Sequence, residues 1–241
     1  MKRRTGDTTA IGGDYQHRAL TQGPAVQRFW HYSKQLAVAR LLPPAAGEFA
    51  LDVGCGSGVI SHYLAGRGAS VLGIDANEAA IDFARSQGPG DGARFQCGLV
   101  DEAFALERPA DKIYCLEVIE HLYADQGRRM LDVFAGLLAR GGRVMLTTPN
   151  YASAWPLIER TMDLLHLAPP LREHQHVTHY TPRRLRRLCT DAGFTVERLM
   201  TQCFIAPWAA ALSWRLAERL AAAEFRCDLR LGSILVAVLR K

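Results

Sequence analysis

The chain has 241 residues, of which 49% are hydrophobic and 22% charged, so it can bury one large core, and two independent domains are not expected. Its net charge of +5 is mildly basic, which suits an anionic partner without identifying one. The six cysteines form no C-x-x-C pair, which argues against a cysteine zinc site and favours reduced core residues. Without an apolar run long enough for a signal or a membrane span, we expect a cytoplasmic protein.

Most of the chain alternates between strand and helix patterns. We assign residues 1–25 to a flexible N-terminus and residues 26–42 to an amphipathic helix. Asn77 is the expected N-cap of a later helix. The predicted strands cover 49–53, 70–75, 93–98, 111–116 and 143–148, and the helices between them cover 59–66, 77–87 and 125–139. This alternation predicts a doubly wound α/β sheet with helices on both faces.

The pattern changes after the fifth strand. Residues 151–181 are rich in aromatics, histidines and prolines with poor periodicity, and we interpret them as a lid inserted into a single domain of residues 26–241. A basic helix over 182–192 and strands near 195–204 and 233–239 follow. An alanine-rich helix over 207–223 would pack into the core or lie on a membrane surface.

A glycine-rich loop follows the first strand and indicates a ligand. Gly54, Gly56 and Gly58 form G-x-G-x-G, and Asp75 ends the next strand. Glycines allow a sharp turn and a close approach to a ligand. A carboxylate at a neighbouring strand end can accept hydrogen bonds from ribose hydroxyls. The dinucleotide fingerprint G-x-G-x-x-G would need a glycine at position 59, so a nicotinamide dehydrogenase is the weaker alternative.

With Asp52 just before the glycines, the segment resembles the class I S-adenosylmethionine-dependent methyltransferases. The resemblance implies a Rossmann-like, seven-stranded sheet, mostly parallel with an antiparallel last strand, and S-adenosyl-L-methionine as cofactor. A cofactor-binding module without catalysis is a further alternative. The expected cofactor contacts are Lys34, Asp52, Gly54, Cys55, Gly56, Gly58, Asp75, Ala76, Val100 and Leu116.

A second group of polar residues follows the fourth strand, at the edge where α/β sheets bind ligands. If a helix opens at Glu117, then Glu117, Glu120 and His121 can converge on one point. The lid adds His174 and His176. Carboxylates with imidazoles suit Mg, Mn or Zn. Two alternatives are solvated polar residues at the start of an amphipathic helix, and His121 acting as a general base without metal.

The motif Glu117-x-x-Glu120-His121, followed by Thr148-Pro149-Asn150 and a later histidine, resembles two methyltransferase groups: the ubiquinone-biosynthesis O-methyltransferases and the small-RNA 2'-hydroxyl methyltransferases. Both resemblances imply a divalent metal beside the methyl donor. The first places the later histidine at His174 and the second at His176. The ubiquinone-type resemblance covers nearly the whole chain, and it implies a cofactor contact at Lys34, where that family has arginine.

These observations predict a metal-assisted O-methyltransferase acting on a hydroxyl of a small or lipid-linked acceptor, with possible peripheral membrane contact. Glu117, His121 and His174 are the expected catalytic residues, since a carboxylate or imidazole can take the hydroxyl proton. An RNA 2'-O-methyltransferase is the alternative. It would need a basic channel and base-stacking aromatics, whereas the chain offers one arginine cluster at 183–187, so nucleic acid is not the expected partner. The sequence does not indicate an oligomeric state.

Overall fold

The computed structural model describes residues 12–88, 92–164, 176–227 and 230–241. Their strands form a seven-stranded sheet in the order β3-β2-β1-β4-β5-β7-β6. Neighbouring strands are parallel from β3 to β5, and β7 is antiparallel to both β5 and β6. The predicted seven-stranded fold is therefore confirmed. The strands are β1 (Phe49–Val53), β2 (Ser70–Asp75), β3 (Ala93–Cys97), β4 (Ala110–Leu116), β5 (Leu138–Pro149), β6 (Thr195–Gln202) and β7 (Ile234–Arg240).

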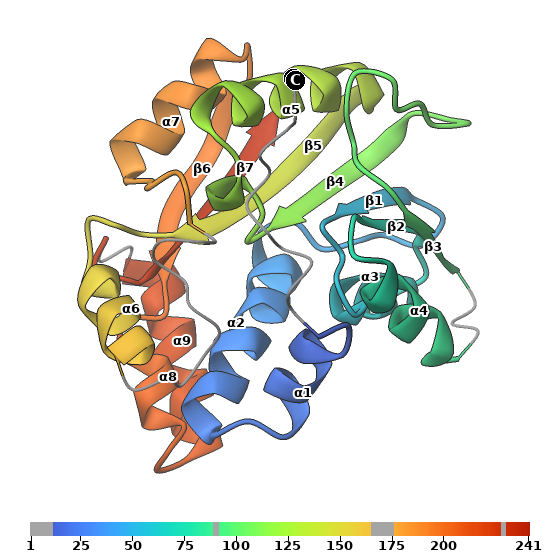
Figure 1. Ribbon diagram of the computed structural model, residues 1–241. Coiled ribbons are helices and arrows are strands. Elements are labelled where there is room, and N and C mark those ends of the chain that lie inside the picture. The colour runs from blue at the N-terminus through green and yellow to red at the C-terminus, as the bar shows by residue number, and fades with distance from the viewer. Residues whose placement is uncertain (1–11, 89–91, 165–175, 228–229) are drawn as a thin grey trace.

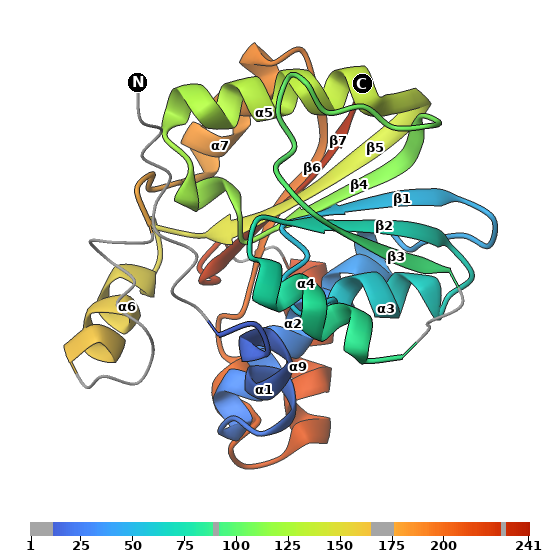
Figure 2. The same cartoon turned by 45° about the vertical axis from the view of Figure 1, so that its right-hand side comes forward.

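Helices cover both faces of the sheet (Figures 1 and 2). One face carries α2, α3 and α4, and the other carries α5 and α7, whereas α1, α8 and α9 gather beyond α2. The helices are α1 (Tyr15–Thr21), α2 (Ala25–Leu41), α3 (Val59–Ala65), α4 (Glu78–Ser86), the 3-10 helix η2 (Ile119–His121), α5 (Ala124–Leu137), α6 (Trp155–Leu164), α7 (Pro182–Asp191), α8 (Ala206–Ala209) and α9 (Trp214–Cys227).

The core consists of two apolar layers separated by the sheet. Leu131 and Phe134 of α5 and Leu185 of α7 are fully buried in one layer, because these helices turn their apolar stripes toward the strands. Val38 of α2 and Leu64 of α3 are fully buried in the other layer. Strand β1 is buried along its whole length, as expected for a central parallel strand. This packing fixes the strand ends, from which the site residues extend.

The segment before residue 26 differs from the predicted flexible N-terminus, because it contains α1. The backbone N–H of His17 in α1 donates to Ser57 Oγ at 3.0 Å, and the His17 ring lies 5.3 Å from that of Phe83. Both contacts join residues far apart in the chain, so a local apolar pattern could not reveal them. Helix α1 thus lies against the glycine loop.

Three further boundaries differ from the prediction. The helix expected over 207–223 is divided into α8 and α9, because Ser213 caps a new helix by accepting from the N–H of Leu216 at 3.4 Å. The irregular segment 151–181 contains α6, and its residues 165–175 lie outside the described part of the chain. Helix α5 ends at Leu137 rather than 139, because Leu138 is extended and pairs with Ala110.

The region of α8 and α9 buries its small residues but leaves some of its large apolar side chains exposed. Ala206, Ala217 and other alanines pack around the fully buried Phe29 of α2. Trp208 is 53% exposed and Leu212 86% exposed. Core packing therefore explains the alanines, Trp214 and Leu220, which pack against this cluster, but not the exposed Trp208 and Leu212. No helix in the described part of the chain combines the length and the apolar character needed to cross a membrane.

Candidate functional site

The glycine loop joins β1 to α3. Gly54, Gly56 and Gly58 have φ of 71°, 50° and 78°, in the left-handed region that side chains rarely adopt. A Cβ atom at Gly58 would lie 2.9 Å from both Ala84 Cβ and Phe95 Cζ, and one at Gly54 would collide with Val118 Cγ2. The loop therefore needs glycine for two reasons: the backbone turns through left-handed conformations, and neighbouring side chains leave no room for a Cβ atom. Without side chains at these positions, a ligand can approach the loop backbone closely.

Asp75 ends β2 beside this loop. Its Oδ2 accepts from the N–H of Gly56 at 2.8 Å, and its Oδ1 accepts from the N–H of Asn77 at 2.8 Å. A carboxylate oxygen can accept more than one hydrogen bond, so both oxygens keep capacity for ribose hydroxyls. Asn77 caps α4 by accepting from the N–H of Ala80 at 3.3 Å, which confirms the predicted cap.

Asp52 supports the loop from beneath. Its side chain is buried, and its Oδ2 accepts from Ser61 Oγ at 2.6 Å. Burial, together with the charge of Asp75, raises the pKa of Asp52 to about 7, although the hydrogen bond from Ser61 opposes this shift. The Asp52 carboxylate is thus linked to α3 through Ser61, and its cofactor contact stays a prediction.

The other predicted cofactor contacts occupy several elements. Leu116 is buried at the end of β4, and Ala76 is exposed directly after β2. Val100 is half-buried beyond β3 and packs against the α5 layer, while Lys34 is half-buried on α2. Cys55 is buried within the glycine loop. The cofactor contacts of these five residues stay predictions.

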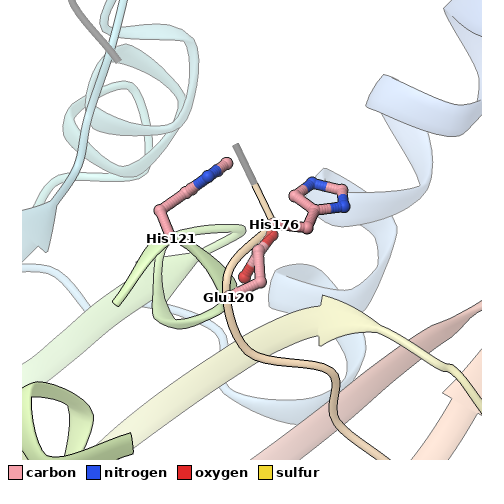
Figure 3. A group of neighbouring side chains, drawn as sticks. All are labelled: Glu120, His121 and His176. Atoms are coloured by element: carbon pink, nitrogen blue, oxygen red, sulfur yellow. The ribbon is translucent and has the colours of Figure 1, made fainter. Parts of the chain in front are cut away.

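A second group of side chains lies beyond the ends of β4 and β5 (Figure 3). Glu120 and His121 come from η2, and His176 comes from the chain that leads into α7. One carboxylate oxygen or ring nitrogen from each residue lies within 4.8 Å of the others. The backbone holds this geometry, because Glu120 O accepts from the N–H groups of Val177 and Thr178 at 2.9 and 3.0 Å. We refer to Glu120, His121 and His176 as the Glu–His cluster.

Glu120 is the buried centre of the Glu–His cluster. Its Oε2 accepts from Thr148 Oγ1 at 3.0 Å, whereas its Oε1 has no hydrogen-bond partner among the described residues. Burial, followed by the charge of Glu117, raises the pKa of Glu120 well above its usual range. An unpartnered carboxylate oxygen is costly in a buried place. It fits a site for a cation, which would supply the missing interaction.

His176 has a carboxylate partner of its own. Its Nδ1 lies 2.6 Å from Oε1 of Glu159 on α6, and both side chains are almost fully buried. Tyr151 donates its hydroxyl to the same Glu159 oxygen at 2.8 Å. Burial lowers the pKa of His176, but the hydrogen bond to Glu159 and the negative charges of Glu120, Glu159 and Glu117 together outweigh burial, so the pKa is raised overall. His174, the other predicted histidine, lies outside the described residues.

Glu117 does not follow the predicted geometry. It precedes η2 with φ of 58°, so no helix opens at this residue. Its Oε1 accepts from Thr147 Oγ1 at 2.8 Å, which directs the carboxylate toward β5. The group of possible metal ligands among the described residues contains Glu120, His121 and His176 but not Glu117. A strained turn thus separates Glu117 from the two residues that the helical spacing grouped with it.

Several contacts of the site were missed by sequence analysis. Glu159 and Tyr151 belong to the segment predicted as an irregular lid, where no spacing marked them as partners of a histidine. The α1 residue His17, which contacts the glycine loop, had no motif either. Thr148 was noted only within the Thr148-Pro149-Asn150 motif. Each of these contacts depends on the approach of separate elements.

Solved structures share this fold. A crystal structure of an S-adenosylmethionine-dependent methyltransferase from Mesorhizobium loti aligns with a TM-score of 0.64 at 23% identity, covering 87% of this chain and 98% of that one. A methyltransferase from Thermotoga maritima, described as a possible histamine N-methyltransferase, aligns with a TM-score of 0.67 at 18% identity over 95% of each chain. At such identities the similarity establishes the fold.

Curated relatives are closer in sequence. The ubiquinone biosynthesis O-methyltransferase of Thiobacillus denitrificans is 32% identical over 160 residues, covering 65% of this chain and 68% of the relative. The protein of the same name from Azoarcus is 33% identical over 162 residues, covering 64% and 67%. The model of the methyltransferase domain family matches residues 26–199, which include both the glycine loop and the Glu–His cluster. The chain therefore belongs to the methyltransferase domain family and is an S-adenosylmethionine-dependent methyltransferase.

Proposed function

We propose that this protein methylates a hydroxyl oxygen of a small or lipid-linked aromatic acceptor, with a divalent cation bound by the Glu–His cluster. The unpartnered, buried Oε1 of Glu120 beside His121 and His176 carries the proposal. One carboxylate and two imidazoles leave coordination positions open for acceptor oxygens and suit Mg, Mn or Zn. The relatives named for O-methylation support oxygen as the acceptor atom.

The donor and acceptor sites are neighbours. Gly54 of the glycine loop touches Val118, and Val118 lies between Glu117 and η2. S-adenosyl-L-methionine, when bound at the loop, supplies a methyl group on a positively charged sulfur. The bare glycine backbone and the Asp75 carboxylate suit its nucleoside and amino-acid parts. Holding donor and acceptor in one orientation supplies much of the rate of such an in-line displacement.

The chain's own side chains can prepare the acceptor. A cation at the cluster would lower the pKa of a coordinated hydroxyl. Glu117, which accepts a hydrogen bond from Thr147, keeps its predicted role as the group that takes the hydroxyl proton while the oxygen–methyl bond forms and the sulfur–methyl bond breaks, and this role is part of the proposal. His121 is the alternative proton acceptor if no cation binds. His174 keeps its predicted catalytic role as a proposal.

Exposed apolar side chains support a lipid-linked acceptor. Leu157 and Leu164 of α6 are 69% and 77% exposed, and α8 and the turn after it add Trp208 and Leu212. Large apolar side chains that stay exposed can mark contacts with apolar partners. Helix α6 also carries Glu159, the partner of His176, so Leu157 and Leu164 belong to the helix that reaches the Glu–His cluster. We propose that these exposed apolar side chains receive the chain of a prenylated acceptor or contact a membrane peripherally.

The decisive experiment measures transfer of a labelled methyl group from S-adenosylmethionine to defined acceptors, with Mn²⁺ and with EDTA. The panel contains a catechol, the same catechol with a prenyl chain, a monohydric phenol and a short RNA ending in a ribose diol. We expect the catechols to react, the prenylated one with the higher kcat/KM, and EDTA to remove most of the activity. Reaction of RNA alone would contradict the proposal, and the absence of transfer to every acceptor would favour a non-catalytic module.

A pair of variants tests the cluster directly. Glu120→Gln keeps the shape but removes the ligand charge, so Mn²⁺-stimulated activity should fall by at least about 100-fold while S-adenosylhomocysteine still binds. Glu224→Gln is the matched control, since Glu224 is also a buried carboxylate but accepts from the N–H groups of Ile205 and Ala206, away from the cluster. Equal activity with EDTA and Mn²⁺ in the wild type would remove the metal from the proposal.

A further inference from the structure

Glu159 is a buried carboxylate for which neither the cofactor site nor the Glu–His cluster accounts. It lies on α6 with its side chain 1% exposed, and its Oε1 is 2.6 Å from His176 Nδ1. Burying a carboxylate is costly unless hydrogen bonds compensate for the loss of water. Here His176 and Tyr151 both reach the same oxygen. Such a site is maintained for a reason other than simple helix packing.

The hydrogen bond determines which nitrogen of His176 faces the cluster. An ionised carboxylate can only accept, so Nδ1 carries the proton that points to Glu159. Nε2 is then the nitrogen with a lone pair to offer. In Figure 3 the rings of His176 and His121 face the same space beside Glu120, and their centroids are 5.3 Å apart. A neutral imidazole with a free Nε2 lone pair is the form that binds metals.

We propose that Glu159 is a positioning residue that fixes the ring orientation and tautomer of His176 and thereby strengthens cation binding at the Glu–His cluster. This inference rests on the proposed metal-assisted function. Histidines that bind metals commonly donate their second ring N–H to a carboxylate, and losing that partner typically weakens metal affinity about 10- to 100-fold. Helix α6 is thus part of the site through Glu159.

Aromatic contacts hold Glu159 in place. Tyr151 stacks on His179 with ring centroids 4.0 Å apart, so its hydroxyl is directed by a fixed ring. At the start of α6, Trp155 stacks on Trp30 of α2 with centroids 4.9 Å apart. Trp30 therefore anchors the start of α6, and Tyr151 holds the Glu159 carboxylate where it contacts His176. A preorganised partner of this kind costs little to orient when a ligand binds.

The test measures binding of Mn²⁺ alone by isothermal titration, without substrate or methyl donor. Glu159→Gln preserves size but replaces the accepting carboxylate by an amide, and we expect Mn²⁺ affinity to fall about 10- to 100-fold. Tyr151→Phe keeps the aromatic ring and removes the donated hydroxyl, so a loss of a few-fold is expected. Glu224→Gln should leave Mn²⁺ affinity unchanged although it removes another buried carboxylate. Thermal melting of each variant reports its folding.

A second measurement separates positioning from structural support. Long-range ¹H–¹⁵N NMR at alkaline pH reports the neutral tautomer of His176, which should be protonated at Nδ1 in the wild type and mixed in Glu159→Gln. Unchanged Mn²⁺ affinity and tautomer in a destabilised Glu159→Gln would overturn the inference and leave the proposed function standing. If Glu159→Gln does not fold, Tyr151→Phe takes its place in both measurements. If the wild type binds no Mn²⁺, the metal proposal fails and the tautomer alone decides the role of Glu159.

Discussion

The glycine loop and the Glu–His cluster lie at the same edge of the sheet, but they are assembled differently. The loop is one continuous segment after β1, and its three glycines have no side chains, so it can offer only backbone groups at these positions. The cluster combines η2 with a residue near α7 and depends on a carboxylate from α6. Backbone recognition needs only a local conformation, whereas side-chain ligands must arrive from several elements. A methyl donor common to many enzymes can thus use a local motif, whereas the proposed acceptor site depends on side chains from several elements.

The largest expected effect comes from the point where the two regions meet. Gly54→Ala would place a Cβ against Val118 Cγ2 and force a side chain onto φ of 71°. Strain and overpacking together cost roughly 2–5 kcal/mol, so S-adenosylhomocysteine affinity should fall about 100-fold or more by isothermal titration. Because Val118 precedes η2, Mn²⁺ affinity should fall too.

Gly47→Ala is the control for this variant. Gly47 has a similar φ of 82°, but a Cβ there meets no atom within 4 Å. Gly47→Ala should lose only the stability that corresponds to the strained backbone conformation. It should keep the wild-type affinity for both S-adenosylhomocysteine and Mn²⁺. If Gly54→Ala weakens cofactor binding but leaves Mn²⁺ binding intact, the two regions are independent despite their contact.

The next effect concerns the support beneath the glycine loop. The pKa of Asp52 is raised to about 7 in the folded protein, so between about pH 4 and pH 7 the folded state holds a proton that the unfolded chain releases. The free energy of unfolding therefore decreases as pH rises through this window, by about 1.4 kcal/mol per pH unit at most. Asp52→Asn cannot titrate but can still accept from Ser61 Oγ.

Urea unfolding of the wild type and Asp52→Asn at several pH values between 4 and 8 measures this contribution. The variant should gain stability relative to the wild type as pH rises. Parallel curves for the two proteins would show that Asp52 titrates near its ordinary value. Asp52 lies beside the glycine loop and not in the Glu–His cluster. Mn²⁺ affinity should therefore be the same in Asp52→Asn and in the wild type.

The smallest effect is expected at the corresponding support of the cluster. Thr148→Val preserves the side-chain shape but removes the hydroxyl that donates to Glu120 Oε2. We expect a loss of about 1–3 kcal/mol in the free energy of unfolding and a few-fold loss of Mn²⁺ affinity, because Glu120 remains but is less firmly held. S-adenosylhomocysteine affinity should be unchanged. A loss of S-adenosylhomocysteine affinity in Thr148→Val would contradict the view that the glycine loop and the Glu–His cluster are held by different residues.

The sequence alone determined the features that depend on neighbouring residues. Apolar periodicity predicted the alternation of strands and helices, and the glycine spacing predicted the sharp turn after β1 with Asp75 beside it, because strand pleating, turn conformation and strand-end position are local properties. The cap at Asn77 followed from the same kind of argument. The spacing Glu117-x-x-Glu120-His121 marked the correct segment but suggested a helix that does not form there.

Only the tertiary structure decided which of these groups meet. The backbone turn at Glu117 separates this carboxylate from Glu120 and His121. Strand β5 supplies Thr147 as the partner of Glu117 and Thr148 as the partner of Glu120. The docking of α6 brings Glu159 to His176, and α1 folds against Ser57 although its own sequence predicted no contact. These contacts join residues distant in the chain, and their energies depend on burial and on the approach of whole elements. Sequence periodicity carries no information about either quantity.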